Sequence, residues 1–437
     1  MRRLLLTALV CLLALSLGSC DSGNGVGAVP IVTRIRVINL VPNAPSIQVQ
    51  LDTDTPFVTG LPFEQTTQYL EVIDGTRELK VSADGGQTNI IDLGVTLFKS
   101  VDYTFVVYGP VEAVKQNLII DTTTLIPNGG TFDLRAINLA TGIAAVDIYL
   151  TPPGTDLGLT APWLTNVALG STTIYVPVPT DSNSELRVTV SGSKEVIYDA
   201  EVGTFPDKSL SQVIVYGKGS AKLVNAAVLN IDSSGTGQVF ESTIAEFKVL
   251  NGTSLGAPIN VFVDGTLVLA NIPFGGVSNY QTVPTGTRVI TVESAATPGA
   301  TLLTVVATLD DATDTSIAVS GPPGALRSLV LTDNNLPSAA NRARVRFVNA
   351  SPDLAAMDVY VNFVKTFAGV ASNNASPYTE LVADPINGTS YEFDFNIAGT
   401  VTPVLRLPGV ALTAGKTYTI YVVGSAAAPQ GVVSIDD

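Results

Sequence analysis

The stretch Val345-Arg346-Phe347-Val348-Asn349 carries a pattern that occurs four times in the chain. Three earlier segments show the same alternation and also end in Asn: 35–39, 134–138 and 247–251. The repeated asparagines are Asn39, Asn138, Asn251 and Asn349. Self-similarity at a fixed period is the signature of a tandem array. The 437-residue chain is therefore predicted to contain four consecutive units.

Two further landmarks follow each Asn in the same order. Nine residues later a polar residue stands inside a second alternating run: Gln48, Asp147, Asn260 and Asp358. Each unit then ends in a strand-like run closed by Gly, at 103–109, 211–217, 315–321 and 418–424. Three landmarks in one order, four times over, support the repeat.

The period inside each unit is two, which is typical of β-strands. In the last unit Val345, Phe347 and Val359 should face a core, while Arg344, Arg346, Asp358 and Tyr360 should face out. The sequence predicts an all-β fold of four tandem immunoglobulin-like β-sandwich domains, arranged as a rod. Their expected limits are 31–127, 131–232, 245–335 and 343–437.

The N-terminus has the features of an exported protein. Arg2 and Arg3 precede an apolar stretch, 4–17, that is shorter than the ~20 residues of a membrane-spanning helix. The next residues complete Leu17-Gly18-Ser19-Cys20, which resembles a bacterial lipobox. The resemblance implies a signal peptide over 1–19, lipidation at Cys20 and a small, Gly-rich tether over 20–30. Cys11 would be removed with the leader, so Cys20 would be the sole remaining thiol.

These features predict a lipid-anchored protein of the bacterial cell envelope, held to the membrane through Cys20. Asp21 resembles the inner-membrane retention signal of enterobacteria, but other phyla do not follow that rule. We therefore expect the outer membrane or the cell surface rather than the inner membrane.

The run from Val345 to Asp353, followed by Met357-Asp358-Val359-Tyr360-Val361-Asn362, resembles the DUF4397 family, a domain of unknown function. Residues 35–45 of the first unit show a similar pattern, whereas the second and third units lack the Asn-x-x-Pro turn. The resemblance implies secreted or surface-anchored bacterial proteins and no established activity. Tyr418 and Tyr103 also resemble the tyrosine corner of sandwich domains, in which the hydroxyl bonds upstream backbone.

Composition excludes several functions. The chain has no His, which removes His-based triads and imidazole metal sites, and its formal charge of −15 argues against nucleic-acid binding. It also lacks a phosphate loop. We expect no enzyme and no cofactor. A carboxylate-type hydrolase would need two acids in one cleft, and calcium could bind the acidic loops 310–314 and 52–54, although solvated loops are favoured there.

Side chains that could bind a ligand are few. Trp163, the sole tryptophan, could stack on a sugar ring, plug a core or anchor an interface, and the tyrosines Tyr149 and Tyr360 are expected to face outward. The four repeated asparagines could contact a ligand, but turn closure is favoured. We expect cross-strand ion pairs between Arg135 and Asp147 and between Arg346 and Asp358.

The sequence therefore predicts a non-catalytic, lipid-anchored envelope protein that presents tandem β-sandwich modules for adhesion or scaffolding. Its partner would be an envelope protein or a polysaccharide. The alternative is a glycan-binding surface lipoprotein centred on Trp163.

Overall fold

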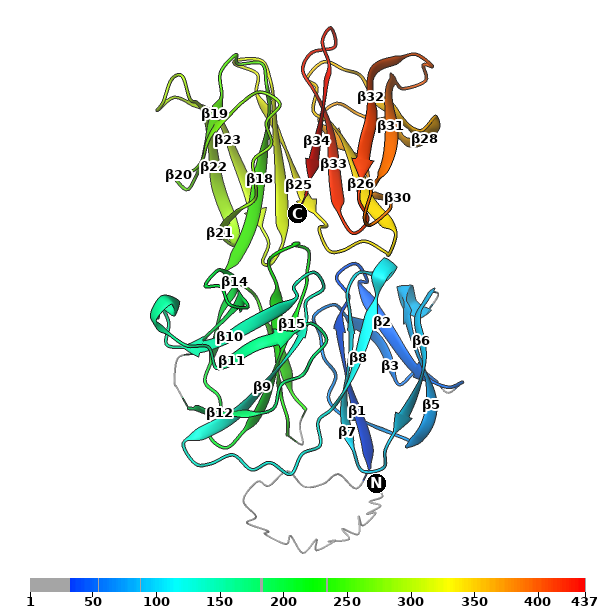
Figure 1. Ribbon diagram of the computed structural model, residues 1–437, viewed down its shortest axis with the longest axis vertical. Helices are drawn as coiled ribbons and strands as arrows, with labels where there is room; N and C mark the ends of the chain where they lie inside the picture. Colours follow the sequence, from blue (N-terminus) through cyan, green and yellow to red (C-terminus); the bar gives the residue numbers. More distant parts are fainter. Residues whose placement is uncertain (1–31, 54, 87, 181–183, 233–234, 437) are drawn as a thin grey trace, which may run out of the picture.

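The computed structural model describes residues 32–53, 55–86, 88–180, 184–232 and 235–436 (Figure 1). The predicted signal peptide, Cys20 and the tether lie outside the described residues. Within them the chain is almost entirely β, with three single-turn 3₁₀ helices: η1 (Asp84–Gly86), η2 (Val111–Ala113) and η3 (Leu157–Leu159). No helix in this part of the chain is long and apolar enough to cross a membrane.

Sandwich 1 consists of two four-stranded sheets. The first has the order β4 (Leu70–Val72), β1 (Thr33–Leu40), β7 (Asp102–Tyr108) and β8 (Lys115–Ile120). The second has the order β3 (Val58–Pro62), β2 (Ser46–Leu51), β5 (Gly75–Ala83) and β6 (Thr88–Leu97).

Sandwich 2 repeats this plan with one extra strand. Its first sheet has the order β12 (Val176–Pro179), β9 (Thr131–Leu139), β15 (Leu210–Tyr216), β16 (Asn225–Asn230) and β17 (Gly237–Phe240). Its second sheet has the order β11 (Leu164–Ala168), β10 (Ala145–Thr151), β13 (Ser184–Val190) and β14 (Val196–Gly203). The extra strand β17 lies beyond 232, where the sequence analysis had placed the end of this unit.

Sandwich 3 pairs β21 (Gln281–Pro284), β18 (Ile244–Thr253), β24 (Asp314–Gly321) and β25 (Arg327–Asp333). Its second sheet has the order β20 (Thr266–Ile272), β19 (Ile259–Val263), β22 (Gly286–Ser294) and β23 (Thr301–Leu309).

Sandwich 4 has a first sheet of β29 (Asn374–Ala375), β26 (Arg342–Asn349), β33 (Thr417–Val423) and β34 (Gln430–Ile435), with β30 (Thr379–Val382) also paired to β26. Its second sheet has the order β28 (Val364–Val370), β27 (Met357–Val361), β31 (Thr389–Ile397) and β32 (Pro403–Leu412).

The four sandwiches share one topology. The sheet that contains the first strand of each unit, called the inner sheet below, pairs that strand in parallel with a strand near the end of the unit: β1 with β7, β9 with β15, β18 with β24 and β26 with β33. The other sheet of each sandwich is called the outer sheet below. Each sandwich has its own apolar core between these two sheets. The predicted all-β tandem sandwich fold is confirmed. Its strand order differs from the ABED and CFG sheets of immunoglobulin constant domains.

The inner sheets are buried on both faces. All seven residues of β7 are buried, as are all seven of β33, so these strands lack a solvent side. One face packs on the sandwich core, and the other packs on the inner sheet of a neighbouring sandwich. Sandwiches 1 and 2 share one such apolar interface, which includes Ile38, Val106, Ile137 and Ile214. Sandwiches 3 and 4 share another, which includes Leu250, Ala318, Val348 and Tyr421.

The molecule is therefore two sandwich pairs stacked on each other, with sandwiches 1 and 2 at one end and 3 and 4 at the other (Figure 1). The expected rod is wrong, because the second apolar face of each inner sheet would be exposed to water in a linear array. The expectation that Arg344 and Arg346 face solvent is wrong for the same reason: both are buried.

Contacts also join the two pairs. Arg344 of sandwich 4 forms an ion pair with Glu112 of sandwich 1 at 2.6 Å. Lys218 of sandwich 2 bridges Glu64 of sandwich 1 and Asp311 of sandwich 3 at 3.2 and 2.7 Å. The segment between sandwiches 3 and 4 contains the buried Asn335 and Leu336. The structure therefore forms a single body in which charged groups link successive sandwiches.

Candidate binding site

The four repeated asparagines are buried and fix the architecture. The side-chain oxygen of Asn39 accepts from the backbone N–H of Val41, and its amide donates to the carbonyl of Leu61 in β3. Asn138 and Asn251 make the equivalent pair of bonds. Asn349 donates to Val370 in β28. Each side chain thus ties the end of an inner strand to the edge strand of the outer sheet, which leaves it no surface to offer a ligand.

The second landmark has a structural role as well. Asp147 accepts from the backbone N–H of Asn166 at 2.7 Å, and Asn260 accepts from Asn271 at 2.8 Å. Asp358 accepts from Gly369 at 2.9 Å. In all three sandwiches the residue that donates its N–H has a positive φ and lies in the edge strand. The polar side chain therefore caps a bulge in the neighbouring strand.

The expected ion pairs of Arg135 with Asp147 and of Arg346 with Asp358 are wrong. Each arginine lies in an inner sheet and each aspartate in an outer sheet, so they cannot face each other. Arg135 instead pairs with Asp121 at 2.9 Å, and Arg346 pairs with Asp333. Asp358 pairs with Lys365 at 2.7 Å.

A buried cation, a tyrosine and a shared carboxylate form a repeated cluster that the sequence analysis missed. The cation stands three residues before each repeated Asn, and its charged group lies 4.6–4.9 Å from the centroid of a tyrosine ring: Arg36 on Tyr69, Arg135 on Tyr175, Lys248 on Tyr280 and Arg346 on Tyr378. Each tyrosine directly precedes the inner-sheet strand that pairs antiparallel with the first strand of its sandwich: β4, β12, β21 and, in sandwich 4, β30. Its recurrence 29–37 residues after each Asn was the available signal.

The carboxylates of these clusters are Asp121, Asp333 and Asp436, each placed directly after or at the end of the last strand of its sandwich. Burial raises the pKa of Asp333, and the neighbouring Arg346 opposes that shift. Since all these charges are used in pairing the sandwiches, they are not available as catalytic groups.

The acidic loops are also engaged. Asp311 pairs with Lys218 and accepts from Asn225, and Asp314 accepts from Asn335 at 2.7 Å. In the other loop, Asp52 pairs with Arg77 at 3.0 Å. Across the part of the chain that the structure describes, no three acidic or Cys side chains gather as a metal site would require.

The expected aromatic candidates do not form one face. Trp163 is 41% exposed, and its indole N–H donates to the carbonyl of Leu150 at 3.0 Å, so it is not a core plug. Tyr149 is buried, with Lys194 over its ring, which corrects the outward position expected for it. Tyr360 is half-buried and lies in sandwich 4, away from the other two in the fold.

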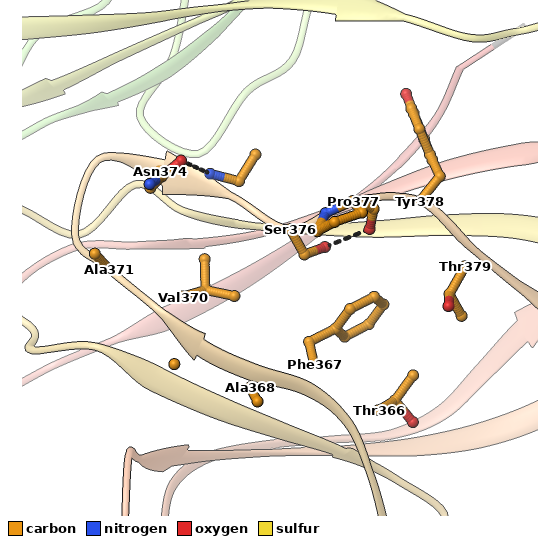
Figure 2. Close-up of a pocket in the computed structure, with 12 residues that line it drawn as sticks. Thr366, Phe367, Ala368, Val370, Ala371, Asn374, Ser376, Pro377, Tyr378 and Thr379 are labelled. Carbon is orange, nitrogen blue, oxygen red and sulfur yellow. Dashed lines mark hydrogen bonds between the residues drawn. The ribbon is translucent and has the colours of Figure 1, made fainter. Parts of the chain in front are cut away.

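A groove of about 300 Å³ opens at one edge of sandwich 4 (Figure 2). It lies between β28, the edge of the outer sheet, and the β29–β30 segment at the edge of the inner sheet. The buried side chains of Phe367 and Val370 form its apolar floor, and Thr366 and Thr379 lie at its side. Tyr378 points away from it (Figure 2), toward the guanidinium of Arg346.

The polar groups of the groove are partly satisfied internally. Asn374 accepts from the backbone N–H of Ala375, and the hydroxyl of Ser376 donates to the carbonyl of Pro377. The lining contains no carboxylate, cation or thiol. The groove can therefore provide apolar contact and hydroxyl hydrogen bonds to a small or extended ligand.

A second hollow, of about 240 Å³, lies between sandwiches 1 and 2 and is lined by Glu64 and Glu241. Glu64 is held by Tyr216, Lys218 and Asn225. A carboxylate that already accepts three donors is fixed as an ion-pair partner, which disfavours a role as a free general base.

Comparison with known proteins identifies the domains. The DUF4397 family, a domain of unknown function, matches residues 33–149, 245–359 and 343–437. The chain belongs to the DUF4397 family. The matches cover sandwiches 1, 3 and 4 and only the first strands of sandwich 2. No curated protein sequence matches this DUF4397 chain.

Three solved structures show distant similarity. The Bacillus anthracis TIE protein is 11% identical, with 94% of this chain and 76% of that chain covered, at a TM-score of 0.14. SpuA, a multi-modular glycogen-degrading pneumococcal virulence factor, is 10% identical, with 63% and 37% covered, at 0.15. A Bacteroides uniformis protein with a proposed role in cell adhesion is 11% identical, with 70% and 99% covered, at 0.16. At these scores none carries an argument about function.

Proposed function

We propose that this DUF4397 protein is a non-catalytic, lipid-anchored component of a bacterial cell envelope that binds an envelope protein or polysaccharide and acts as an adhesin or scaffold. The anchor would be lipid on Cys20, at the outer membrane or cell surface. The observation that carries the binding role is the groove beside β28, which combines an apolar floor with hydroxyl groups.

Two features support a binding protein over an enzyme. The charged clusters between paired sandwiches are occupied in holding the fold together. The groove lies at a sheet edge, where an extended peptide can add as a further strand. A glycan chain can also bind in a groove that has an apolar floor and hydroxyl groups. The pull-down below therefore compares polysaccharides with proteins.

The test is a pull-down of residues 20–437 against purified envelope polysaccharides and envelope proteins. The Ala368→Arg variant places a long side chain at an exposed position of the groove without touching the core. Its matched control is Ala270→Arg, the corresponding exposed edge position of β20 in sandwich 3. We expect Ala368→Arg to reduce retention at least about tenfold and Ala270→Arg to leave it unchanged. Equal retention by both variants would contradict a role for the groove.

The exposure of Trp163 favours a second candidate, a glycan-binding lipoprotein centred on that side chain. A partly exposed indole can stack on a sugar ring, and the N–H of Trp163 is already satisfied by the carbonyl of Leu150. Saccharide retention lost in Trp163→Ala but kept in Ala368→Arg would favour this candidate.

Anchoring is tested separately by following the chain in cells. Wild-type protein should incorporate labelled palmitate and fractionate with membranes, whereas Cys20→Ala should do neither. A Cys20→Ala chain that is still acylated would contradict the proposed anchor.

A further inference from the structure

We propose that the N-terminal end of sandwich 1 rests on the lipid bilayer through an apolar rim formed by Ile73, Phe98 and Ile126, so that sandwiches 3 and 4 face away from the membrane. This inference rests on the proposed lipid anchor at Cys20 and adds to it a membrane-contact surface and an orientation.

The rim surrounds the point where the described chain begins. Thr33 donates through its hydroxyl to the carbonyl of Phe98 at 3.0 Å. On its other side Thr33 is paired with Val72 of β4, directly before Ile73. Phe98 and Ile73 therefore flank the first strand at its N-terminal end.

The segment between sandwiches 1 and 2 completes the rim. Asp121 bonds to Asp102 through the backbone, beside the start of β7, and the hydroxyl of Thr122 accepts from the N–H of Asp102. Residues 122–130 then run along the end of the molecule that carries the N marker (Figure 1). Three loops thus meet at this one end.

The side chains of the rim are strongly exposed. Ile73 is 66% exposed, Phe98 60% and Ile126 55%, although each belongs to a residue type that is usually buried. Exposed apolar groups on adjacent loops are a common feature of membrane- and protein-contact surfaces. The short chain between the proposed lipid on Cys20 and the rim favours a membrane over a protein as the partner.

Cys20 precedes the first described residue, Val32, by few positions, so residues 20–31 can span at most about 40 Å. A lipid on Cys20 therefore holds this end of sandwich 1 near the bilayer at a high effective concentration. The chain is acidic overall, so the contact is expected to depend on apolar insertion and to be strongest on zwitterionic lipids.

The experiment uses residues 20–437, in which Cys20 is the sole thiol. Coupling Cys20 to a maleimide lipid in phosphatidylcholine vesicles provides the anchor in vitro. A Trp163→Phe background removes the native tryptophan, and Phe98→Trp then reports on the rim. The matched control is Val401→Trp, which lies in the exposed turn between β31 and β32, in the sandwich pair distal from the N-terminal end.

We expect brominated acyl chains to quench the Phe98→Trp fluorescence about twofold, with a blue shift, and to leave Val401→Trp unchanged. The uncoupled chain should show no quenching at either position. An unquenched Phe98→Trp on coupled vesicles, or equal quenching at both positions, would overturn the rim and the orientation.

The two proposals fail in distinguishable ways. A chain that is not acylated at Cys20 in cells overturns the proposed anchor, whereas the vesicle experiment tests the rim with a chemical anchor. A rim variant, Phe98→Asn with Ile73→Asn, should remain coupled to vesicles but lose the preferred orientation, detected as protease access to the loops of sandwich 1. Unchanged protection in this variant would count against the rim.

Discussion

The two sandwich pairs have the same architecture but satisfy their buried cations differently. Between sandwiches 3 and 4 the arrangement is reciprocal: Lys248 of sandwich 3 pairs with Asp436 of sandwich 4, and Arg346 of sandwich 4 pairs with Asp333 of sandwich 3. Each domain gives one cation and one carboxylate to its partner.

Between sandwiches 1 and 2 one carboxylate serves both cations. Asp121 pairs with Arg36 of its own sandwich at 3.2 Å and with Arg135 of sandwich 2 at 2.9 Å. Sandwich 2 has Ile231 at the position of Asp121, since Ile231 bonds to Leu210 as Asp121 bonds to Asp102. Arg36 turns to the carbonyls of Asn230 and Gly235 instead, at 2.9 and 3.1 Å.

The difference shows that the interface requires satisfied cations rather than one fixed set of partners. A buried guanidinium without acceptors is costly, so the loss of one aspartate must be offset by backbone carbonyls. In the interface between sandwiches 1 and 2, both buried arginines depend on the single carboxylate of Asp121.

The largest expected effect therefore comes from Asp121→Ala. It removes the carboxylate from two buried arginines and the acceptor of the hydroxyls of Thr104 and Tyr69. We expect a loss of at least ~3–5 kcal/mol in the unfolding free energy, against a smaller loss for Asp436→Ala, which strands one cation. Urea denaturation of both variants measures this, and an equal or smaller loss for Asp121→Ala would argue against the shared-carboxylate interpretation.

Ile231→Asp should sharpen the comparison. By analogy with Asp436, an aspartate at this position in sandwich 2 faces the cation of sandwich 1, Arg36. In the double variant Asp121→Ala/Ile231→Asp, we expect roughly half of the unfolding free energy lost in Asp121→Ala to be recovered, because one of the two stranded cations regains a partner. A double variant as unstable as Asp121→Ala alone would mean that position 231 does not reach Arg36.

The junction between the two pairs should respond to pH through Asp314. It is paired in register with Glu246 on the adjacent parallel strand, and it accepts from Ala221 of sandwich 2 and from Asn335. Lys222 forms an ion pair with Glu246, with 3.2 Å between Nζ and Oε1. Burial first, and then Glu246, raises the pKa of Asp314 from 3.8 to about 7.

A raised pKa in the folded state means that the protonated form is favoured there. The stabilisation from Asp314 is therefore fully present below about pH 4 and is lost as the pH rises through about 7. We expect Asp314→Asn to flatten this window by on the order of 2–4 kcal/mol between pH 5 and pH 8. Denaturation at the two pH values measures it, and the same pH slope in both proteins would refute the assignment.

The smallest expected effect separates the sandwiches with a tyrosine corner from those without. The hydroxyl of Tyr103 accepts from the N–H of Phe98, and that of Tyr418 accepts from Thr413, five residues upstream in each case. Sandwiches 2 and 3 have Ser211 and Thr315 at this position. Tyr103→Phe and Tyr418→Phe should each cost ~1 kcal/mol in thermal unfolding, while Ser211→Ala should cost less.

Much of each sandwich could be predicted from local pattern. The period of two gave the strands, the Asn landmarks gave the turns, and Tyr103 and Tyr418 gave their corners, because each of these depends on residues close in the sequence or within one sheet. The polar residues of the second landmark were found but assigned wrongly, since the bulges that Asp147 and Asp358 cap lie in strands paired across a turn.

The groove beside β28 had no sequence signal. Its lining comes from two edges that belong to different sheets, and residues such as Ala368 and Thr379 are ordinary in either strand. The rim of Ile73, Phe98 and Ile126 is likewise formed by three loops far apart in the chain. Such sites depend on which ends the topology brings together.

The sequence by itself determined the number of units, their all-β character and the alternation of each strand, because these depend on short-range periodicity and turn chemistry. Only the tertiary structure decided what covers the second face of each inner sheet. Alternation divides side chains between two faces, but it cannot say whether a face that carries Ile38, Arg36 and Thr104 meets water or another sheet. Burial between sandwiches made the arginines interior groups and turned four tandem domains into two pairs.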